Sequence, residues 1–352
     1  MKNLPQYWDS AATTPVDKRV LDAMLPYFSE IFGNASSNHI YGKQAKLAIE
    51  NARGYVAQLI NASSSEVFFT SGATESINWA LKGFLEANPE KGNHIITVKT
   101  EHKAVLNTCE YLESKGFEVT YLDVNENGLI DLDVLECSIK SSTALVAVMY
   151  VNNEIGVIQD IAGIAELCSR RNVVFFSDAT QAVGKIPLDV MHEEVDLLCF
   201  SGHKFNGPKG IGVLYIKKGL KLESLIHGGG QEQGLRGGTY NTPLIVGLGE
   251  AARIIREEGP QIHLRLVEER KRIERYLESN QIAVINFKGV NKAPHIISAT
   301  LLSSDAEDFI IEHANDFSIS TGSACSSRII EISHVLKALD LPNQRTVRIS
   351  IS

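Results

Sequence analysis

Short, predominantly apolar segments recur through the first two thirds of the chain, and stretches with helical spacing separate several of them. Helical patterns cover 76–85, 105–115 and 161–171, and the apolar segments span 67–69, 94–98, 119–122, 144–151, 173–176, 197–200 and 211–216. Strands that are apolar at every position are buried on both faces, which is typical of a parallel sheet between helices. We therefore predict an α/β fold with a mostly parallel seven-stranded sheet. Ligands are expected in loops at the carboxyl ends of its strands.

The remaining third of the chain has a different pattern. A charged helix over 262–279 is followed by strand candidates at 282–285, 295–301 and 317–320 and by a helix at 306–314. A chain of 352 residues is longer than a single hydrophobic core usually accommodates. We predict a large domain over 15–252. A smaller α+β domain would comprise 1–14 and 253–352.

The charge and the cysteines exclude several classes. The net charge is −8, without a block of like charges, which argues against direct nucleic-acid binding. No apolar run approaches the roughly 20 residues that span a bilayer, and the N-terminus shows no signal pattern. We therefore expect a cytoplasmic protein that does not bind membranes. Five widely spaced cysteines favour neither disulfides nor a metal site.

Three strand-end loops carry candidate chemistry. The loop 70–75 has small residues before a helix, so backbone N–H groups of residues such as Ala73 and Thr74 could hold an anion; a helix cap is the alternative. Asp178 follows an apolar strand and could pair with a protonated ring nitrogen, or cap the next helix.

Lys204 follows the strand at 197–200 among small and polar residues. A desolvated lysine there would be a nucleophile toward an aldehyde, and Ser201 and His203 could donate to a phosphate. A turn lysine without a function is the alternative.

Two further loops could complete the site. His102 could stack on a flat ring and move protons, or be a structural histidine. The amides of Asn152 and Asn153 could bind a phenolate-type oxygen, or serve a turn. Pyridoxal phosphate requires this combination of an anion cradle, an acid, an amine and a stacking face. A dinucleotide site is disfavoured, because no G-x-G-x-x-G motif opens the first strand–helix unit.

Cys325 lies among small polar residues, in the segment 320–327. An exposed thiol in such surroundings is a candidate for reaction, and a loop cysteine without a role is the alternative. The other four, Cys109, Cys137, Cys168 and Cys199, occupy apolar patterns and are predicted to be small buried side chains.

Taken together, these motifs resemble those of the class I cysteine desulfurases, which are fold-type I pyridoxal-phosphate enzymes. The resemblance runs from residue 7 to residue 350, and its motifs are Thr70-Ser71-Gly72-Ala73-Thr74-Glu75-Ser76, Asn152-Asn153-Glu154-Ile155-Gly156, Asp178-Ala179-Thr180-Gln181, Ser201-Gly202-His203-Lys204 and Ser323-Ala324-Cys325-Ser326.

The resemblance implies a role for each candidate residue. Lys204 would hold pyridoxal 5'-phosphate as a Schiff base, Asp178 would pair with the ring nitrogen, and His102 would stack on the ring and help to transfer protons. Other residues would bind the ring oxygen (Gln181, Asn153), the phosphate (Ala73, Thr74, Ser201, His203), the phosphate of the partner in a homodimer (Thr239) and the substrate carboxylate (Arg348, with Asn34 nearby).

The implied reaction converts L-cysteine to L-alanine and leaves a persulfide on Cys325. The sulfur would then pass to an acceptor protein, and iron–sulfur cluster assembly, tRNA thiolation and DNA phosphorothioation are all possible destinations. A selenocysteine lyase, or a lyase or transaminase acting on another amino acid, would share the Lys204 and Asp178 chemistry. A protein-binding scaffold is a third hypothesis, but it explains none of the five loops.

Overall fold

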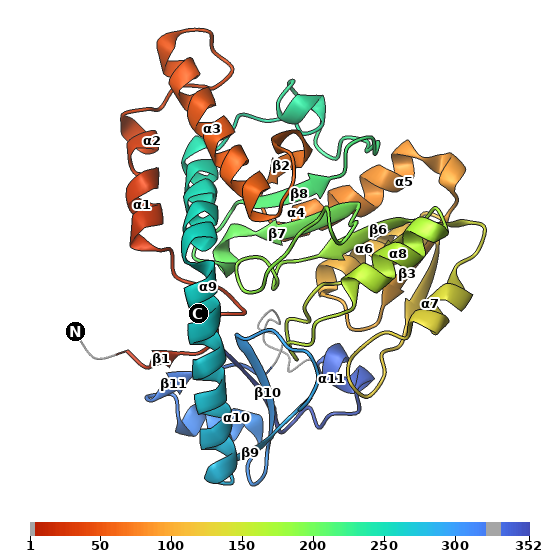
Figure 1. Cartoon of the computed structure of the whole chain (residues 1–352), viewed down its shortest axis with the longest axis vertical. Coiled ribbons are helices and arrows are strands. Elements are labelled where there is room, and N and C mark those ends of the chain that lie inside the picture. The colour runs from red at the N-terminus through yellow and green to blue at the C-terminus, as the bar shows by residue number, and fades with distance from the viewer. Residues whose placement is uncertain (1–3, 322–331) are drawn as a thin grey trace.

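The computed structural model describes residues 4–321 and 332–352, and its centre is a seven-stranded sheet (Figure 1). Its strands are β2 (Val67–Thr70), β3 (His94–Val98), β4 (Glu118–Leu122), β5 (Thr143–Ala147), β6 (Val174–Asp178), β7 (Leu197–Ser201) and β8 (Gly212–Ile216). Their order is β2-β8-β7-β6-β5-β3-β4, and only β8 runs antiparallel to its neighbours. The predicted mostly parallel seven-stranded sheet is therefore confirmed.

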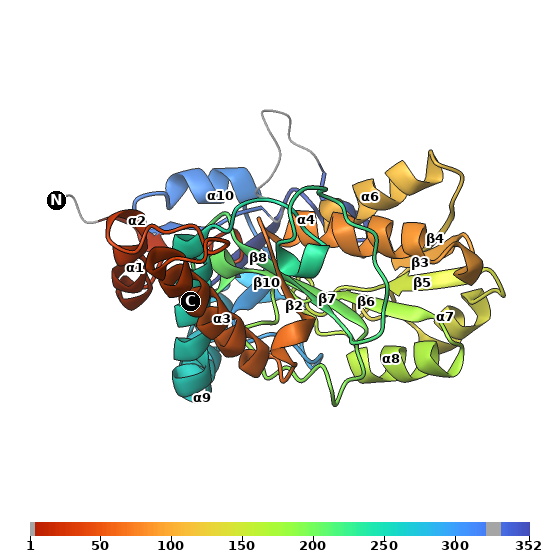
Figure 2. The ribbon, with the colours of Figure 1, turned by 90° about the horizontal axis from the view of Figure 1, so that it is seen from above.

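Helices cover both faces of this sheet (Figure 2). One face carries α4 (Ala73–Asn78), a π-helical turn (Trp79–Gly83), α5 (Phe84–Ala87) and α6 (Lys103–Glu113); the other carries α7 (Leu132–Ser138) and α8 (Ile161–Arg170). In β6, Phe175 and Phe176 belong to different apolar clusters, since successive side chains in a strand point to opposite faces. Burial on both faces explains why these strands are predominantly apolar.

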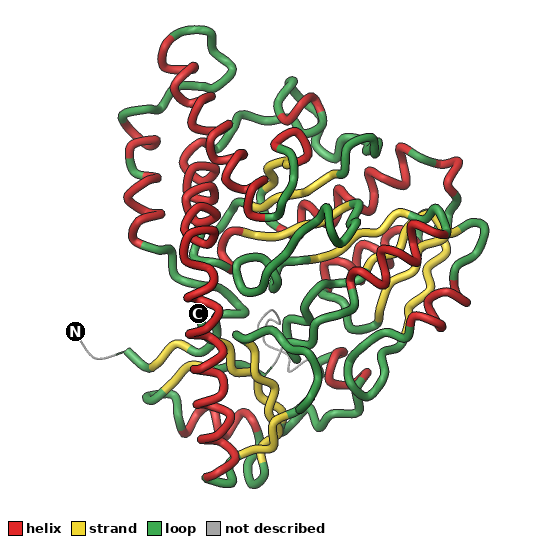
Figure 3. The backbone as a smooth tube through the Cα atoms, in the orientation of Figure 1, coloured by secondary structure: helices red, strands yellow, loops and turns green. Residues whose placement is uncertain are grey.

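A 38-residue helix, α9 (Thr242–Ser279), runs along the whole molecule (Figure 3). Its first half packs against α3 (Ile40–Leu59) and α1 (Lys18–Met24), and α1 is followed by the short helix α2 (Pro26–Ser29). A Cβ atom on Gly249 would lie 2.5 Å from Ala52 Cβ, so the close approach of α9 and α3 requires glycine at this position.

The second half of α9 packs on a small three-stranded antiparallel sheet. This sheet has the order β12-β10-β9, formed by β12 (Thr346–Ser350), β10 (Ile296–Leu301) and β9 (Ala283–Ile285), with α10 (Ala306–Glu312) beside it. Near the N-terminus, β1 (Gln6–Tyr7) pairs in parallel with β11 (Phe317–Ser318), and Trp8 stacks on Phe317. We propose on this basis that 1–14 and 253–352 form the small domain, with α9 crossing the boundary.

Two local predictions differ from the structure. The charged helix predicted over 262–279 is longer in the structure, although Pro260 lacks the N–H that would bond the carbonyl of Arg256. It begins instead at Thr242 and continues through Pro260, since buried residues on both sides, such as Ile254 and Leu266, hold it against the two sheets. The prediction that Cys137 is buried is wrong: it lies on the exposed side of α7, whose buried residue is Leu135, whereas Cys109, Cys168 and Cys199 are buried.

Within residues 4–321 and 332–352, no helix combines the length and the apolar composition that crossing a membrane requires.

Candidate active site

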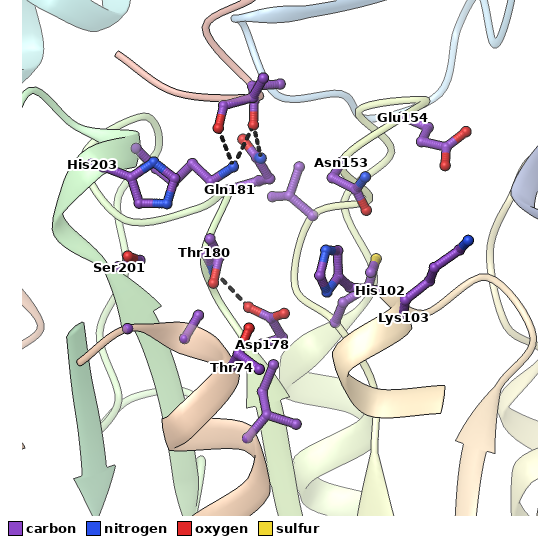
Figure 4. A pocket seen from close by; sticks show the side chains of 18 of the residues that line it. Thr74, His102, Lys103, Asn153, Glu154, Asp178, Thr180, Gln181, Ser201 and His203 are labelled. Carbon is purple, nitrogen blue, oxygen red and sulfur yellow. Dashed lines mark hydrogen bonds between the residues drawn. The ribbon is translucent and has the colours of Figure 1, made fainter. Parts of the chain in front are cut away.

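The carboxyl ends of the strands and the N-terminal segment enclose a cavity of about 590 Å³. Figure 4 shows Ser201 and His203 on one side, His102 and Asn153 on the other, and Asp178 between them. The predicted residues that line the cavity are Ala73, Thr74, His102, Asn153, Asp178, Gln181, Ser201, His203, Lys204 and Arg348. Residues from five separate loops therefore meet, as the sheet topology requires.

Lys204 ends a short 3-10 turn (Gly202–Lys204) directly after β7. Its Nζ donates hydrogen bonds to the carbonyl oxygens of Ala11 at 2.6 Å and Ala12 at 2.9 Å. The N-terminal segment is fixed over this turn, because the backbone N–H and Oγ1 of Thr14 both donate to the carbonyl of His203. Lys204 is half-buried and points into the cavity, not toward bulk solvent.

Asp178, the last residue of β6, is only 5% exposed. One oxygen, Oδ1, accepts from the backbone N–H of Thr180 at 2.9 Å and from Cys199 Sγ at 3.7 Å. No lysine, arginine or histidine of the described segments forms an ion pair with its carboxylate. Asp178 thus serves a turn with one oxygen, while the buried negative charge still lacks a cationic partner.

His102 precedes α6, and its Nδ1 accepts the backbone N–H of Ala104 at 3.1 Å. In the neutral ring this contact places the proton on Nε2. Burial lowers the pKa of His102, although the negative charge of Asp178 acts in the opposite direction. The structure therefore favours a neutral imidazole beside the cavity.

Between β7 and the start of α4 lies a small cradle. Gly72 has φ +156°, and a Cβ atom added there would point at Ser201 Oγ from 3.8 Å. No side chain caps the first turn of α4, which starts at Ala73 and Thr74. His203 Nδ1 lies 3.1 Å from Thr13 Oγ1, and burial together with Lys204 lowers the pKa of His203 to about 4. Backbone N–H groups, a hydroxyl and a neutral imidazole thus face the same space, which suits a phosphate.

Arg348 in β12 enters the cavity from the small sheet. Its Nη1 donates to the carbonyl oxygen of Asn153 at 3.0 Å, and its Nη2 lies 2.7 Å from Asp9 Oδ1. Its Nε is buried and has no hydrogen-bond partner among the described residues. A guanidinium that lines a cavity is suited to binding a carboxylate.

Two predicted residues of the described segments, Thr239 and Asn34, do not line this cavity. Thr239 lines an adjacent cavity of about 250 Å³ that shares Ser71 and Gly210 with the first. Asn34 is exposed, and its side chain accepts the backbone N–H of Ser36. Cys325 lies outside the described residues.

Sequence reasoning missed several residues of the cavity wall. Ala11 and Ala12 belong to a motif used for the resemblance, but nothing in their type predicts that their carbonyls bind Lys204. Thr180, two residues after Asp178, also lines the cavity. His334, at the start of α11 (His334–Ala338), donates from Nε2 to the carbonyl of Glu101 at 2.8 Å. Only the fold brings this distant residue to the site.

The comparisons with known proteins agree with this geometry. The family described as aminotransferase class-V matches residues 6–352. A cysteine desulfurase IscS from Neisseria meningitidis serogroup C (strain 053442) is 49% identical over 95% of this chain and 83% of its own length.

Two solved structures have the same fold. A NifS-like protein has a TM-score of 0.90 at 38% identity, covering 99% of this chain and 94% of its own. A structure described as SspA in complex with cysteine has a TM-score of 0.88 at 40% identity, covering 98% of both chains.

The site and the fold define a pyridoxal-phosphate enzyme, and the chain belongs to the aminotransferase class-V family. Within that family it is a cysteine desulfurase.

The described residues fit the cofactor of this family, pyridoxal 5'-phosphate. The buried carboxylate of Asp178 forms no ion pair with a described residue, and the cradle between Gly72 and Ser201 can hold an anion. A protonated ring nitrogen and a phosphate would satisfy these two groups.

Proposed function

We propose that the enzyme converts L-cysteine to L-alanine and holds the released sulfur as a persulfide on Cys325. The observation that carries this proposal is the meeting of Lys204, Asp178 and His102 in one cavity, beside the small-domain Arg348. The solved relative that contains cysteine supports the same substrate.

We propose that the cofactor is held at both ends of the cavity. Ala73, Thr74, Ser201 and His203 would bind its phosphate, and Asp178 would bind its ring nitrogen. Gln181 and Asn153 would lie near the ring oxygen, and Lys204 would form the covalent link. When bound, pyridoxal phosphate supplies an aldehyde for the substrate amine and a ring that accepts electrons from the α-carbon.

The substrate would be oriented by its carboxylate on the guanidinium of Arg348, which lines the cavity. Lys204 Nζ would then remove the α-proton, and His102, with its proton on Nε2, would stack against the ring and exchange protons. Desolvation favours the neutral imidazole, whose Nε2–H can donate a hydrogen bond into the cavity.

The sulfur step balances without an external oxidant. The Cys325 thiolate attacks the substrate sulfur, the Cβ–S bond breaks, and an S–S bond forms. The substrate carbon is reduced and gains a proton, while the two sulfurs share the oxidation. The products are L-alanine and a persulfide that a sulfur-acceptor protein must remove.

We propose a homodimer in which Thr239 reaches the phosphate of the partner subunit. Large apolar side chains are exposed along α1 to α3, including Leu25, Phe28, Phe32 and Leu47, which are 53–66% exposed. Such a patch is larger than scattered surface residues would give and favours contact with another protein. Sedimentation velocity checks this: a Phe28→Glu/Phe32→Glu variant should be monomeric if the patch forms the interface.

The function is tested by alanine release from L-cysteine in the presence of a thiol reductant. Lys204→Ala and Cys325→Ala should each lose at least about 100-fold in rate. Cys137→Ala is the matched control, because Cys137 is an exposed free thiol on α7, and it should stay within about twofold. Unchanged alanine release by Cys325→Ala would contradict the proposal.

A further inference from the structure

A buried histidine, His295, is connected to Lys204 through the side chain of Gln181 and the carbonyl oxygen of Ala11. His295 immediately precedes β10, and its Nε2 lies 3.1 Å from Gln181 Oε1. Gln181 Nε2 donates to the carbonyl oxygen of Ala11 at 2.9 Å, the same oxygen that accepts Lys204 Nζ at 2.6 Å. The chain of contacts is therefore His295, Gln181, Ala11, Lys204.

The chemistry of these groups determines the orientation of each. The carbonyl of Ala11 can only accept, so the atom of Gln181 that faces it must be the amide nitrogen. Gln181 Oε1 then faces His295, and because this oxygen also only accepts, His295 Nε2 must carry a hydrogen. The opposite amide orientation would place two acceptors against each other at Ala11.

The surroundings of His295 keep its ring neutral. It is fully buried, and Nδ1 has no hydrogen-bond partner. Burial lowers the pKa of His295 well below its ordinary value, and four cations add to the effect in this order: Lys185, Arg348, Lys204 and Arg270. A neutral ring has a single N–H, and the contact with Gln181 uses it.

The orientation of the Gln181 amide determines which atom it presents to the cavity. An amide nitrogen carries two hydrogens, and Gln181 uses one on Ala11. Because Gln181 lines the cavity, its second N–H is available to a ligand oxygen there. A reversed amide would present a carbonyl oxygen and repel an anionic one.

We propose that His295 is a positioning residue: it fixes the amide of Gln181 as a donor toward the cavity and toward the Ala11 carbonyl that holds Lys204. This inference rests on the proposed function, since the ligand oxygen is taken to belong to pyridoxal phosphate. It assigns to the small domain a part in orienting the cofactor pocket, in addition to Arg348.

The test compares two variants that differ in one donor. His295→Gln can place an N–H close to the position of Nε2, whereas His295→Leu cannot. Apo-protein is titrated with pyridoxal phosphate, and the dissociation constant, the visible absorption band and the melting temperature of the apo-protein are measured. We expect His295→Leu to bind about tenfold more weakly with a shifted band, and His295→Gln to stay within about threefold of wild type.

A double-mutant cycle shows whether His295 acts through Gln181. Adding His295→Leu to Gln181→Leu should weaken binding no further than Gln181→Leu alone. Equal dissociation constants and spectra for His295→Leu and His295→Gln, whatever their melting temperatures, would overturn the inference and reduce His295 to a packing role. A wild-type protein that takes up no pyridoxal phosphate would instead overturn the proposed function, and this inference with it.

Discussion

Arg348, which lines the cavity, forms a salt bridge of 2.7 Å with Asp9, although the two residues lie 339 positions apart in the chain. The arginine side chain is 3% exposed and the aspartate 19%. Asp9 therefore neutralises a buried guanidinium before any substrate arrives, and it also fixes the direction in which the remaining donors point.

Replacing Arg348 by lysine should raise the KM for L-cysteine about tenfold or more, with a smaller effect on kcat. Lysine keeps the charge but cannot bind Asp9, Asn153 and a carboxylate with one planar group. Steady-state kinetics measure this. Arg345→Lys is the control, since Arg345 is exposed and lies just before the same strand. An unchanged KM in Arg348→Lys would exclude the arginine from substrate binding.

Asp178→Asn should reduce alanine formation roughly 100-fold and weaken cofactor retention. Asparagine can still accept the N–H of Thr180, so the turn survives while the charge is lost. The measurement is activity together with cofactor absorbance after dialysis. Asp189→Asn changes a half-buried aspartate that accepts the backbone N–H groups of Met191 and His192 and does not line the cavity, and it should leave both unchanged. Full activity in Asp178→Asn would mean that the buried carboxylate serves only the turn.

Glu101 predicts a dependence of stability on pH. Burial raises the pKa of its carboxyl group well above the ordinary value; Oε1 accepts the N–H of Met149, and Oε2 has no partner. The folded state therefore holds a proton that the unfolded state releases above about pH 4.3. This contribution to stability is present at low pH and is lost as the pH rises toward the folded-state pKa.

Glu101→Gln should consequently become more stable relative to wild type as the pH increases from about 5 to 8. Urea unfolding at several pH values measures the difference in free energy of unfolding. A difference that stays constant across this range would show that Glu101 does not retain its proton in the folded state.

Breaking the ion pair of Arg53 and Glu232 should strongly destabilise the fold. Two hydrogen bonds of 2.9 Å join the side chains, both residues are buried, and Glu232 also accepts the N–H of Phe69. Arg53→Met leaves an unpaired buried carboxylate and should lower the free energy of unfolding by about 3–5 kcal/mol. The exposed Arg256→Met is the control and should cost less than about 1 kcal/mol. If Arg53→Met lowers the free energy of unfolding by less than about 1 kcal/mol, the buried ion pair does not have the predicted stabilising effect.

The sheet was predictable because strands such as β3, β5 and β6 are buried on both faces and so are predominantly apolar. The candidate loops were predictable because they follow those strands. The long helix begins earlier than predicted. The sequence pattern does not display the tertiary packing that keeps the chain helical through Pro260.

The contacts that complete the site could not be predicted in the same way. The carbonyl oxygens of Ala11 and Ala12 bind Lys204 through backbone atoms, which every residue type has. His295 and His334 reach the site from the small domain and carry no local signal of their position. Asn34 is the opposite case. The resemblance implies that it lies near the substrate carboxylate, but it does not line the cavity of its own chain.

The central claim is that sulfur leaves L-cysteine and is carried by Cys325. The most direct test is peptide mass spectrometry after one equivalent of L-cysteine is added to the holoenzyme without reductant, with free thiols alkylated afterwards. We predict one additional sulfur atom on the peptide that contains Cys325 and none on the peptide that contains Cys137, together with one equivalent of L-alanine. Alanine formed with no sulfur on Cys325, or sulfur found equally on Cys137, would contradict the account.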